Sequence, residues 1–185
     1  MRLWEKHGMT QRADNLQILN FLRKHKTAKS KKVMVNMAER KTNIKNVVFI
    51  CTGNSCRSAM AEGIFKKLCA EKGYDIKCSS AGTAASSGYG ASKYAIEACK
   101  EIGVDISRHK SQGIYGVDLK EVDLFCVVSM YHADILMSMG VPQNKIFVMS
   151  REKGGITDPF GSDLNFYRAC RDEIVSVLTD LLEKL

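Results

Sequence analysis

The sequence predicts an α/β fold, a doubly wound four-stranded parallel sheet with helices on both faces. From residue 46 onward, short apolar runs alternate with longer segments of helical period, the pattern of parallel strands joined by helices. With 185 residues, of which 45% are hydrophobic, the chain can bury one core but is short for two ordinary domains. Only two prolines, Pro142 and Pro159, interrupt it.

Each expected element follows from its own stretch of sequence. The apolar runs that predict strands lie at 47–51, 76–80, 124–129 and 146–149. The longer segments predict helices at about 58–72, 91–103, 131–139 and 163–184. The last helix has an apolar face formed by Ile174, Val177, Leu178, Leu181 and Leu182. These elements account for most of the chain after residue 46.

The net charge of +8 is concentrated at the N-terminal end. Residues 1–45 hold twelve of the 28 basic residues and three of the 20 acidic ones, whereas residues 46–185 are nearly neutral. We expect 1–45 to be a flexible basic extension or, alternatively, an arm that meets an acidic partner. Residues 46–185 form the expected functional domain, and their charge gives no reason to expect a nucleic-acid partner.

The seven cysteines are an odd number, scattered without C-x-x-C pairs, which argues against a disulfide scaffold. No apolar run is long enough for a signal sequence or a membrane span. We therefore expect a cytoplasmic protein without a membrane partner. The sequence carries no signal for an oligomeric state.

The stretch VVFICTGNSCRSAMAEG at 47–63 joins the first strand to the first helix. In an open α/β sheet, ligands bind where the carboxyl end of a strand turns into a helix. Backbone N–H groups of such a turn form a cradle for a tetrahedral oxyanion, and Gly53 offers conformational freedom for close approach. A Walker loop needs Lys before Ser or Thr at the helix start, and Arg57-Ser58 stands there instead.

The spacing of Cys51 and Arg57 indicates nucleophilic chemistry on that oxyanion. The dipoles that bind the oxyanion also stabilise a thiolate at Cys51. Arg57 offers a planar fork of donors to two oxygens. Ser58 can donate to the Cys51 sulfur or cap the helix, and Asn54 can tie the loop to its neighbours. The other loop residues expected to surround the oxyanion are Thr52, Ser55 and Cys56.

This loop resembles the signature loop of the low-molecular-weight protein tyrosine phosphatase family. The similarity continues to the C-terminus through SSAGT at 79–83, DISRHKS at 105–111 and DPFG at 158–161. It implies a phosphorylated protein as substrate, a cysteinyl-phosphate intermediate, and no metal or other cofactor. It also gives Asp158 the role of general acid and then base. The family usually has proline at Ala59, so we expect some loss of rigidity there but no change in chemistry.

Within the family the chain resembles the bacterial protein-arginine phosphatase branch. Ser55 stands where phosphotyrosine enzymes carry an apolar residue and this branch carries a hydroxyl residue, and Phe160 is followed by Gly161 instead of a second aromatic residue. Ser55 and Phe160 are expected to line the pocket, while phosphotyrosine and phosphoarginine both stay open as substrates. Cys56 either forms a protective disulfide with Cys51 or fills space in the loop.

CTGNSCRS followed by MAEG is also similar to the thioredoxin-coupled arsenate reductases. Those enzymes release product through a relay of two further cysteines after the third strand. Here Cys126 falls inside that strand, Ser129 stands at the first relay position, and no cysteine follows before Cys170. Without a relay, a cysteine–arsenic adduct has no evident resolution within the chain, so arsenate reduction is disfavoured.

A non-catalytic phosphate-binding module is the third possibility. Such a protein is expected to have lost one of Cys51, Arg57 and Asp158, and all three are present. His132 and His109 have no partners at metal-ligand spacing, so we expect no metal to be bound. We expect His132 to be structural, and His109 to be structural or to lie at the edge of the pocket.

Overall fold

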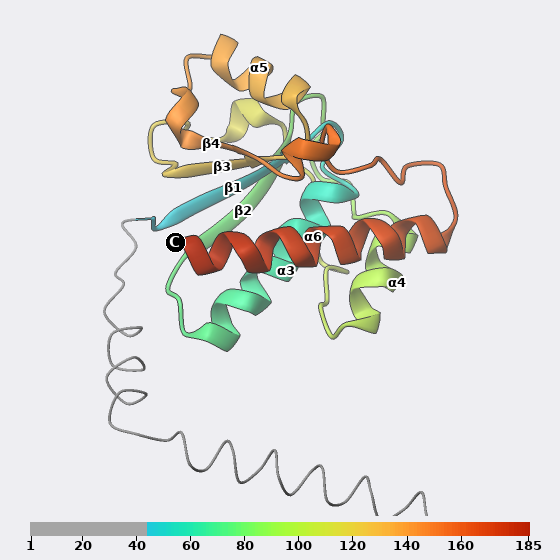
Figure 1. Cartoon of the computed structure of the whole chain (residues 1–185). Helices are drawn as coiled ribbons and strands as arrows, with labels where there is room; N and C mark the ends of the chain where they lie inside the picture. The colour runs from blue at the N-terminus through green and yellow to red at the C-terminus, as the bar shows by residue number, and fades with distance from the viewer. Residues whose placement is uncertain (1–43) are drawn as a thin grey trace, which may run out of the picture. The chain divides into compact units, whose positions relative to one another are not determined.

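The computed structural model describes residues 44–185, so nearly all of the predicted extension 1–45 lies outside the described residues. Its four strands form one parallel sheet in the order β2-β1-β3-β4 (Figure 1). The strands are β1 (Asn46–Cys51), β2 (Lys77–Gly82), β3 (Leu124–Val127) and β4 (Ile146–Val148). In the register, Val47 pairs with Cys78 of β2 and with Leu124 of β3. The predicted α/β architecture is confirmed.

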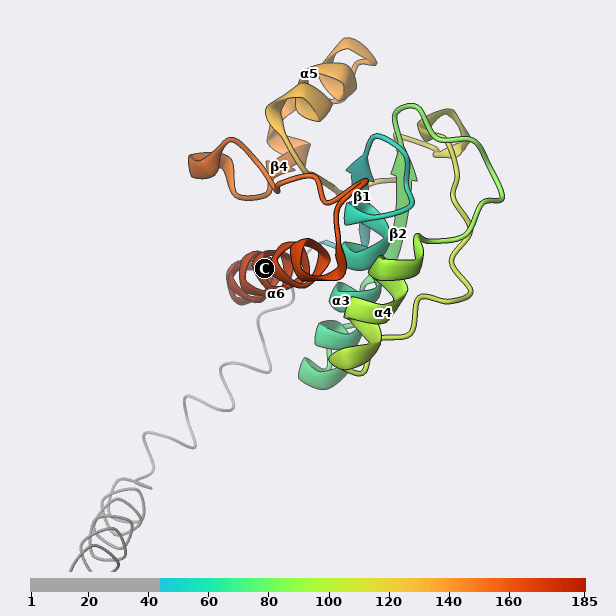
Figure 2. The same ribbon diagram turned by 90° about the vertical axis from the view of Figure 1, so that its right-hand side faces the viewer.

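Four helices pack on this sheet within two residues of their predicted bounds. They are α3 (Arg57–Lys72), α4 (Lys93–Glu101), α5 (Met130–Ser138) and α6 (Leu164–Lys184). Short 3-10 turns cover Ile114–Gly116, Gln143–Lys145 and Arg151–Lys153. Helices α3, α4 and α6 lie together on one face of the sheet, and α5 lies on the other (Figures 1 and 2).

The two faces of β1 explain why its sequence is a continuous apolar run. Phe49 belongs to the core under α3 and α6, where its ring lies 5.4 Å from that of Phe65. Val48 and Ile50 belong to a second core cluster, together with Leu136 of α5. Since both faces are covered by helices, every position from the second residue of the strand onward is buried.

Two strands end two residues away from their predicted C-terminal bounds. β3 ends at Val127 instead of residue 129, because the residues that follow no longer pair with β4. The Val128 N–H still donates to the Ile50 carbonyl of β1 at 3.1 Å, but its own carbonyl accepts from Ile156, beyond β4, at 2.8 Å. β2 runs two residues further than predicted, to Gly82, which pairs with Cys51.

The strand order predicts at which edge of the sheet a ligand binds. From β1 the chain passes through α3 to β2 on one side, and later through α4 to β3 on the other side. In such a sheet the order reverses between β1 and β3, and ligands bind at the carboxyl ends of the strands at that point. The segments that follow β1, β3 and β4 all begin at this edge.

Candidate active site

The loop of residues 51–57 leaves β1 at the carboxyl edge of the sheet and enters α3. The carbonyl oxygens of Cys51, Thr52 and Ser55 accept hydrogen bonds of 2.8–3.0 Å from the backbone of residues 83, 84 and 92. The Asn54 carbonyl lies 2.7 Å from Nε2 of His109. Because the carbonyls are bonded to the surrounding chain, the loop can offer its N–H groups to an anion.

The Cys51 sulfur lies at the base of this loop and is only 2% exposed. Its Sγ is 2.9 Å from the Ser58 hydroxyl and accepts from the Asn54 N–H at 3.2 Å. Both contacts can stabilise a sulfur anion. Ser58 does not cap the helix, since α3 begins at Arg57 with Cys56 in the cap position. Two roles were predicted for Ser58, and the structure shows the contact with the Cys51 sulfur and not the helix cap.

Asn54 gives the loop its shape. Its backbone is left-handed, with φ of 53°, whereas Gly53 is not among the residues with positive φ. The expectation that Gly53 supplies the unusual conformation is therefore wrong. The Asn54 side chain donates to the hydroxyls of Ser58 and Ser80, each at 2.8 Å, and accepts from the Gln112 N–H at 2.9 Å. These three hydrogen bonds hold the loop against β2 and the chain before β3, as Asn54 was predicted to do.

Substitution of Asn54 separates the contribution of its side-chain hydrogen bonds to stability from the contribution of its left-handed backbone. Asn54→Ala loses the buried hydrogen bonds and forces an alanine into the left-handed region, so we expect a loss of roughly 2–4 kcal/mol in the free energy of unfolding. Asn54→Gly loses the same bonds but accepts the backbone angle, and should be about 1 kcal/mol more stable than the alanine variant. Urea denaturation measures both values. Equal stabilities for the two variants would show that the backbone angle carries no strain.

Arg57 and Asp158 meet across the mouth of the loop. Arg57 is 8% exposed, and its Nη2 forms a short ion pair with Oδ2 of Asp158, whose side chain is half exposed. The Arg57 Nε–H is buried and has no hydrogen-bond acceptor among residues 44–185. Asp158 Oδ1 accepts from the Phe160 N–H at 3.1 Å, which fixes the turn that carries the carboxylate. A guanidinium with an unused buried donor is suited to bind a phosphoryl oxygen.

A cavity of about 250 Å³ brings the predicted site residues together. It is lined by Cys51, Thr52, Gly53, Ser55, Cys56, Arg57, Asp158 and Phe160. Asn54 and Ser58 stand behind this lining, where both are fully buried. Phe160 is 74% exposed and so forms part of the open rim. The cavity brings a thiol, a guanidinium and a carboxyl group together in one small space.

The Cys56 thiol is held from behind by two helices. Its Sγ donates to the Ser92 hydroxyl at 3.4 Å and lies 3.3 Å from the Tyr167 hydroxyl of α6. Burial and the contact with Cys56 raise the pKa of Tyr167 to about 12, so this partner is neutral. All seven cysteines are free thiols. These contacts support the packing role of Cys56, and a disulfide with Cys51 stays a prediction.

The two histidines lie closer to the loop than the sequence suggests. His132, which follows β3, places Nε2 3.0 Å from the Thr52 hydroxyl. His109 contacts the Asn54 carbonyl, and its Nδ1 lies 3.9 Å from the Glu62 carboxylate. Neither residue has a signal in the local sequence, and only the meeting of β1 and β3 at one edge indicates that His132 approaches Thr52.

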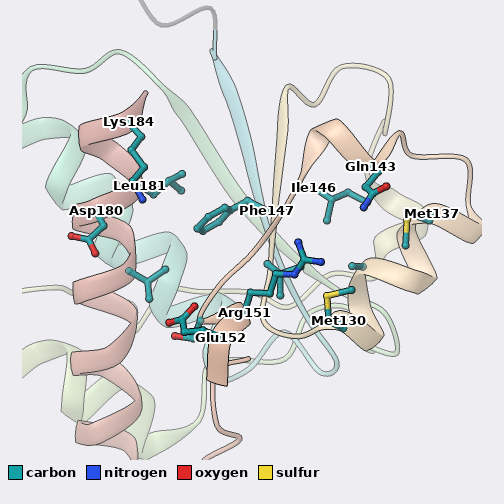
Figure 3. A pocket seen from close by; sticks show the side chains of 14 residues that line it. Met130, Met137, Gln143, Ile146, Phe147, Arg151, Glu152, Asp180, Leu181 and Lys184 are labelled. Atoms are coloured by element: carbon teal, nitrogen blue, oxygen red, sulfur yellow. The ribbon is translucent and has the colours of Figure 1, made fainter. Parts of the chain in front are cut away.

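A larger cavity of about 340 Å³ lies elsewhere, between α5, β4 and α6 (Figure 3). Its lining includes Met130, Phe147 and Leu181, with charged side chains such as Arg151 and Glu152. No cysteine lines this larger cavity. Within residues 44–185, no three His, Cys, Asp or Glu side chains are grouped as a metal site requires. None of the helices in this described range is long and apolar enough to cross a membrane.

Two curated relatives share most of the chain. A protein-arginine-phosphatase of Bacillus subtilis is 32% identical over 145 residues, which cover 76% of this chain and 96% of that protein. An arsenate reductase of Staphylococcus aureus is 38% identical over 130 residues, which cover 70% of this chain and 90% of that protein. Sequence identity thus points to two activities on one fold.

Two solved structures match the described fold. A low molecular weight protein tyrosine phosphatase from T. tengcongensis is 38% identical, with a TM-score of 0.72, and covers 76% of this chain and 99% of its own. A mutant of YwlE arginine phosphatase with a phosphorylated active-site serine is 31% identical, with a TM-score of 0.71, and covers 76% of this chain and 95% of its own. The family model for low molecular weight phosphotyrosine protein phosphatase matches residues 46–185, so the chain belongs to this family.

Proposed function

We propose that the protein hydrolyses phosphorylated proteins through a phosphocysteine intermediate on Cys51, and that residues 46–185 form the catalytic domain. The observation that carries this proposal is the convergence of Cys51, Arg57 and Asp158 in one cavity at the N-terminus of α3. A nucleophile, an oxyanion cradle and a proton donor are the three groups that phosphoryl transfer to a cysteine requires.

In the first step the Cys51 thiolate attacks phosphorus. A sulfur–phosphorus bond forms while the bond from phosphorus to the leaving oxygen or nitrogen breaks. The loop N–H groups and Arg57 bind the equatorial oxygens, where charge accumulates. Because the phosphoryl group needs the guanidinium donors that Asp158 uses in this structure, its binding releases the carboxyl group to reach the leaving atom. Asp158, a carboxylate while it is paired with Arg57, takes up a proton from solvent once it is released and donates this proton to the leaving atom.

In the second step water attacks phosphorus and the sulfur–phosphorus bond breaks. Asp158, now a carboxylate, takes the proton from water, and Cys51 leaves as a thiolate. The Ser58 hydroxyl, 2.9 Å from Sγ, stabilises this leaving sulfur. Each residue has therefore returned to its starting state at the end of the cycle.

The hydroxyl-bearing residues of the lining support phosphoarginine over phosphotyrosine as the substrate. Thr52 and Ser55, which both carry a hydroxyl group, line the cavity together with Cys51, and Phe160 is the one aromatic residue of the lining. A guanidine presents N–H donors to such a wall, whereas an aromatic ring needs apolar contacts. The similarity to the Bacillus subtilis protein-arginine-phosphatase supports the same choice.

Arsenate reduction is the alternative that sequence identity raises. A relay cysteine must reach the Cys51 adduct at the mouth of the loop. Cys126 is fully buried inside β3, Cys170 is 4% exposed in α6, and Ser129 follows β3 at the cap position of α5. These positions support phosphatase chemistry over reduction.

We also propose that the protein works in the cytoplasm. Seven free thiols and a nearly neutral folded domain suit a protein that works in the reducing cytoplasm on soluble phosphoproteins.

Rates on three substrates test the proposed function. We expect turnover of an arginine-phosphorylated peptide, slower turnover of a phosphotyrosyl peptide, and no multiple turnover of arsenate with thioredoxin and its reductase. Activity should persist in EDTA, because no step uses a metal ion. Sustained arsenate reduction without phosphatase activity, or a strict requirement for a divalent metal, would overturn the proposal.

A further inference from the structure

Three hydrogen-bonded side chains connect the segment after β3 with the wall of the cavity that contains Cys51. Ser129 Oγ lies 2.7 Å from Nδ1 of His132, and His132 Nε2 lies 3.0 Å from Oγ1 of Thr52. Thr52 lines the cavity beside Cys51. The mechanism derived above assigns no role to His132 or Ser129, although the imidazole contacts a side chain of the cavity wall.

His132 is held in its neutral form. Its side chain is buried, with 3% of the residue exposed. Burial and, next, the charge of Arg57 lower the pKa of His132 to about 4, against a smaller opposite effect of Asp158. A neutral imidazole has one N–H donor and one lone-pair acceptor. The imidazole therefore donates a hydrogen bond to one of the two hydroxyls, Ser129 or Thr52, and accepts one from the other.

Ser129 occupies the cap position of α5 but does not cap the helix. Serine at this position usually accepts a hydrogen bond from the first turn. Here the side chain makes no capping hydrogen bond and contacts Nδ1 of His132 instead. The Ser129 hydroxyl therefore contacts the imidazole in place of the backbone of the first helical turn.

We propose that His132 is a positioning residue that makes the Thr52 hydroxyl an acceptor for a guanidine N–H of phosphoarginine, and so favours guanidine over aryl phosphates. The inference rests on the proposed function, since it concerns the substrate of the same site. Ser129 orients the ring, and Thr52 is the residue that touches the substrate.

The direction of the hydrogen bonds explains the preference. A guanidine offers several N–H donors, so the wall that faces it must accept. The Thr52 hydroxyl accepts with a defined geometry when its own hydrogen is donated to a lone pair, and we assign that lone pair to Nε2 of neutral His132, which lies 3.0 Å away. The Nδ1–H then donates to Ser129. An aryl phosphate has no donor beside its leaving oxygen, so the same arrangement gives it no hydrogen bond.

The test compares kcat/KM for an arginine-phosphorylated peptide and for para-nitrophenyl phosphate in the full chain. Thr52→Val keeps the shape and removes the hydroxyl, and His132→Leu keeps the bulk and removes the acceptor. Each should lower kcat/KM on phosphoarginine about tenfold, the value of one hydrogen bond, and change the aryl rate by less than about twofold. His132→Gln restores an acceptor and should recover most of the loss. Asp134→Ala, on the exposed face of α5, is the matched control.

The double variant shows whether His132 acts through Thr52. If it does, adding His132→Leu to Thr52→Val causes no further loss on phosphoarginine. Independent, additive losses would overturn the proposal, as would equal losses on both substrates or failure of His132→Gln to recover activity. A wild-type enzyme that hydrolyses only aryl phosphates overturns this inference and leaves the phosphatase mechanism intact. Hydrolysis of neither substrate shows instead that the proposed function is wrong.

Discussion

Cys51→Ser is expected to lower steady-state turnover of para-nitrophenyl phosphate by on the order of 10⁶, as when a covalent enzyme loses its nucleophile. A serine hydroxyl attacks phosphorus far more slowly than a thiolate, and the resulting phosphate ester is a poor leaving group in the second step. The fold should persist, because serine is nearly isosteric with the cysteine it replaces. Steady-state kinetics and circular dichroism measure the two effects.

Cys51→Ala serves as the control, since alanine cannot form any covalent intermediate. Both variants should still bind inorganic phosphate, because the loop N–H groups and Arg57 are unchanged. Residual turnover above about a hundredth of the wild-type rate in either variant would exclude Cys51 as the nucleophile.

Asp158→Asn is expected to slow substrates with poor leaving groups by ~10²–10⁴-fold, the usual value of general acid catalysis. Para-nitrophenyl phosphate should be affected much less in the first step, because its phenol departs with little protonation. Asparagine can still accept a hydrogen bond from Arg57, so the geometry of the loop is largely kept. Single-turnover rates on the phosphotyrosyl peptide and on para-nitrophenyl phosphate give the comparison.

An equal loss on good and poor leaving groups would mean that Asp158 only shapes its loop. The next acid in the sequence, Asp163, is a weak replacement. Its Oδ1 accepts from the N–H groups of Asn165 and Phe166 at 2.8 and 3.2 Å, so it caps α6. Asp158 is thus the carboxylate of this loop that reaches Arg57.

The sheet and the position of the loop between β1 and α3 were predictable because both depend on local sequence. Strand periodicity and the change to helical period place Cys51 at the end of β1 and Arg57 at the start of α3, as the structure confirms. Ser55 and Phe160, which the family resemblance implied for the pocket, line one cavity.

The conformation of the loop was not predictable from residue type alone. Glycine is the usual residue at positive φ, yet here Asn54 takes that conformation. Its side chain is bonded to Ser80 and Gln112, residues far along the chain, and these contacts offset the backbone cost. A local pattern cannot report such distant partners.

The contact of His132 with Thr52 has the same origin. The two residues are 80 positions apart and meet only because β1 and β3 are neighbours in the sheet. Tyr167 reaches Cys56 in the same way, from a helix at the other end of the chain. Once the strand order is known, both contacts become reasonable expectations.

A pre-steady-state burst in the Asp158→Asn variant tests the covalent mechanism most directly. Para-nitrophenol leaves without help, but hydrolysis of phosphocysteine then lacks the base that activates water. The covalent mechanism predicts a burst of one equivalent of para-nitrophenol per active site, followed by slow turnover. Mass spectrometry should then detect one phosphoryl group on the Cys51 peptide. A linear time course without a burst, and an unmodified Cys51 peptide in acid-quenched samples, would contradict it.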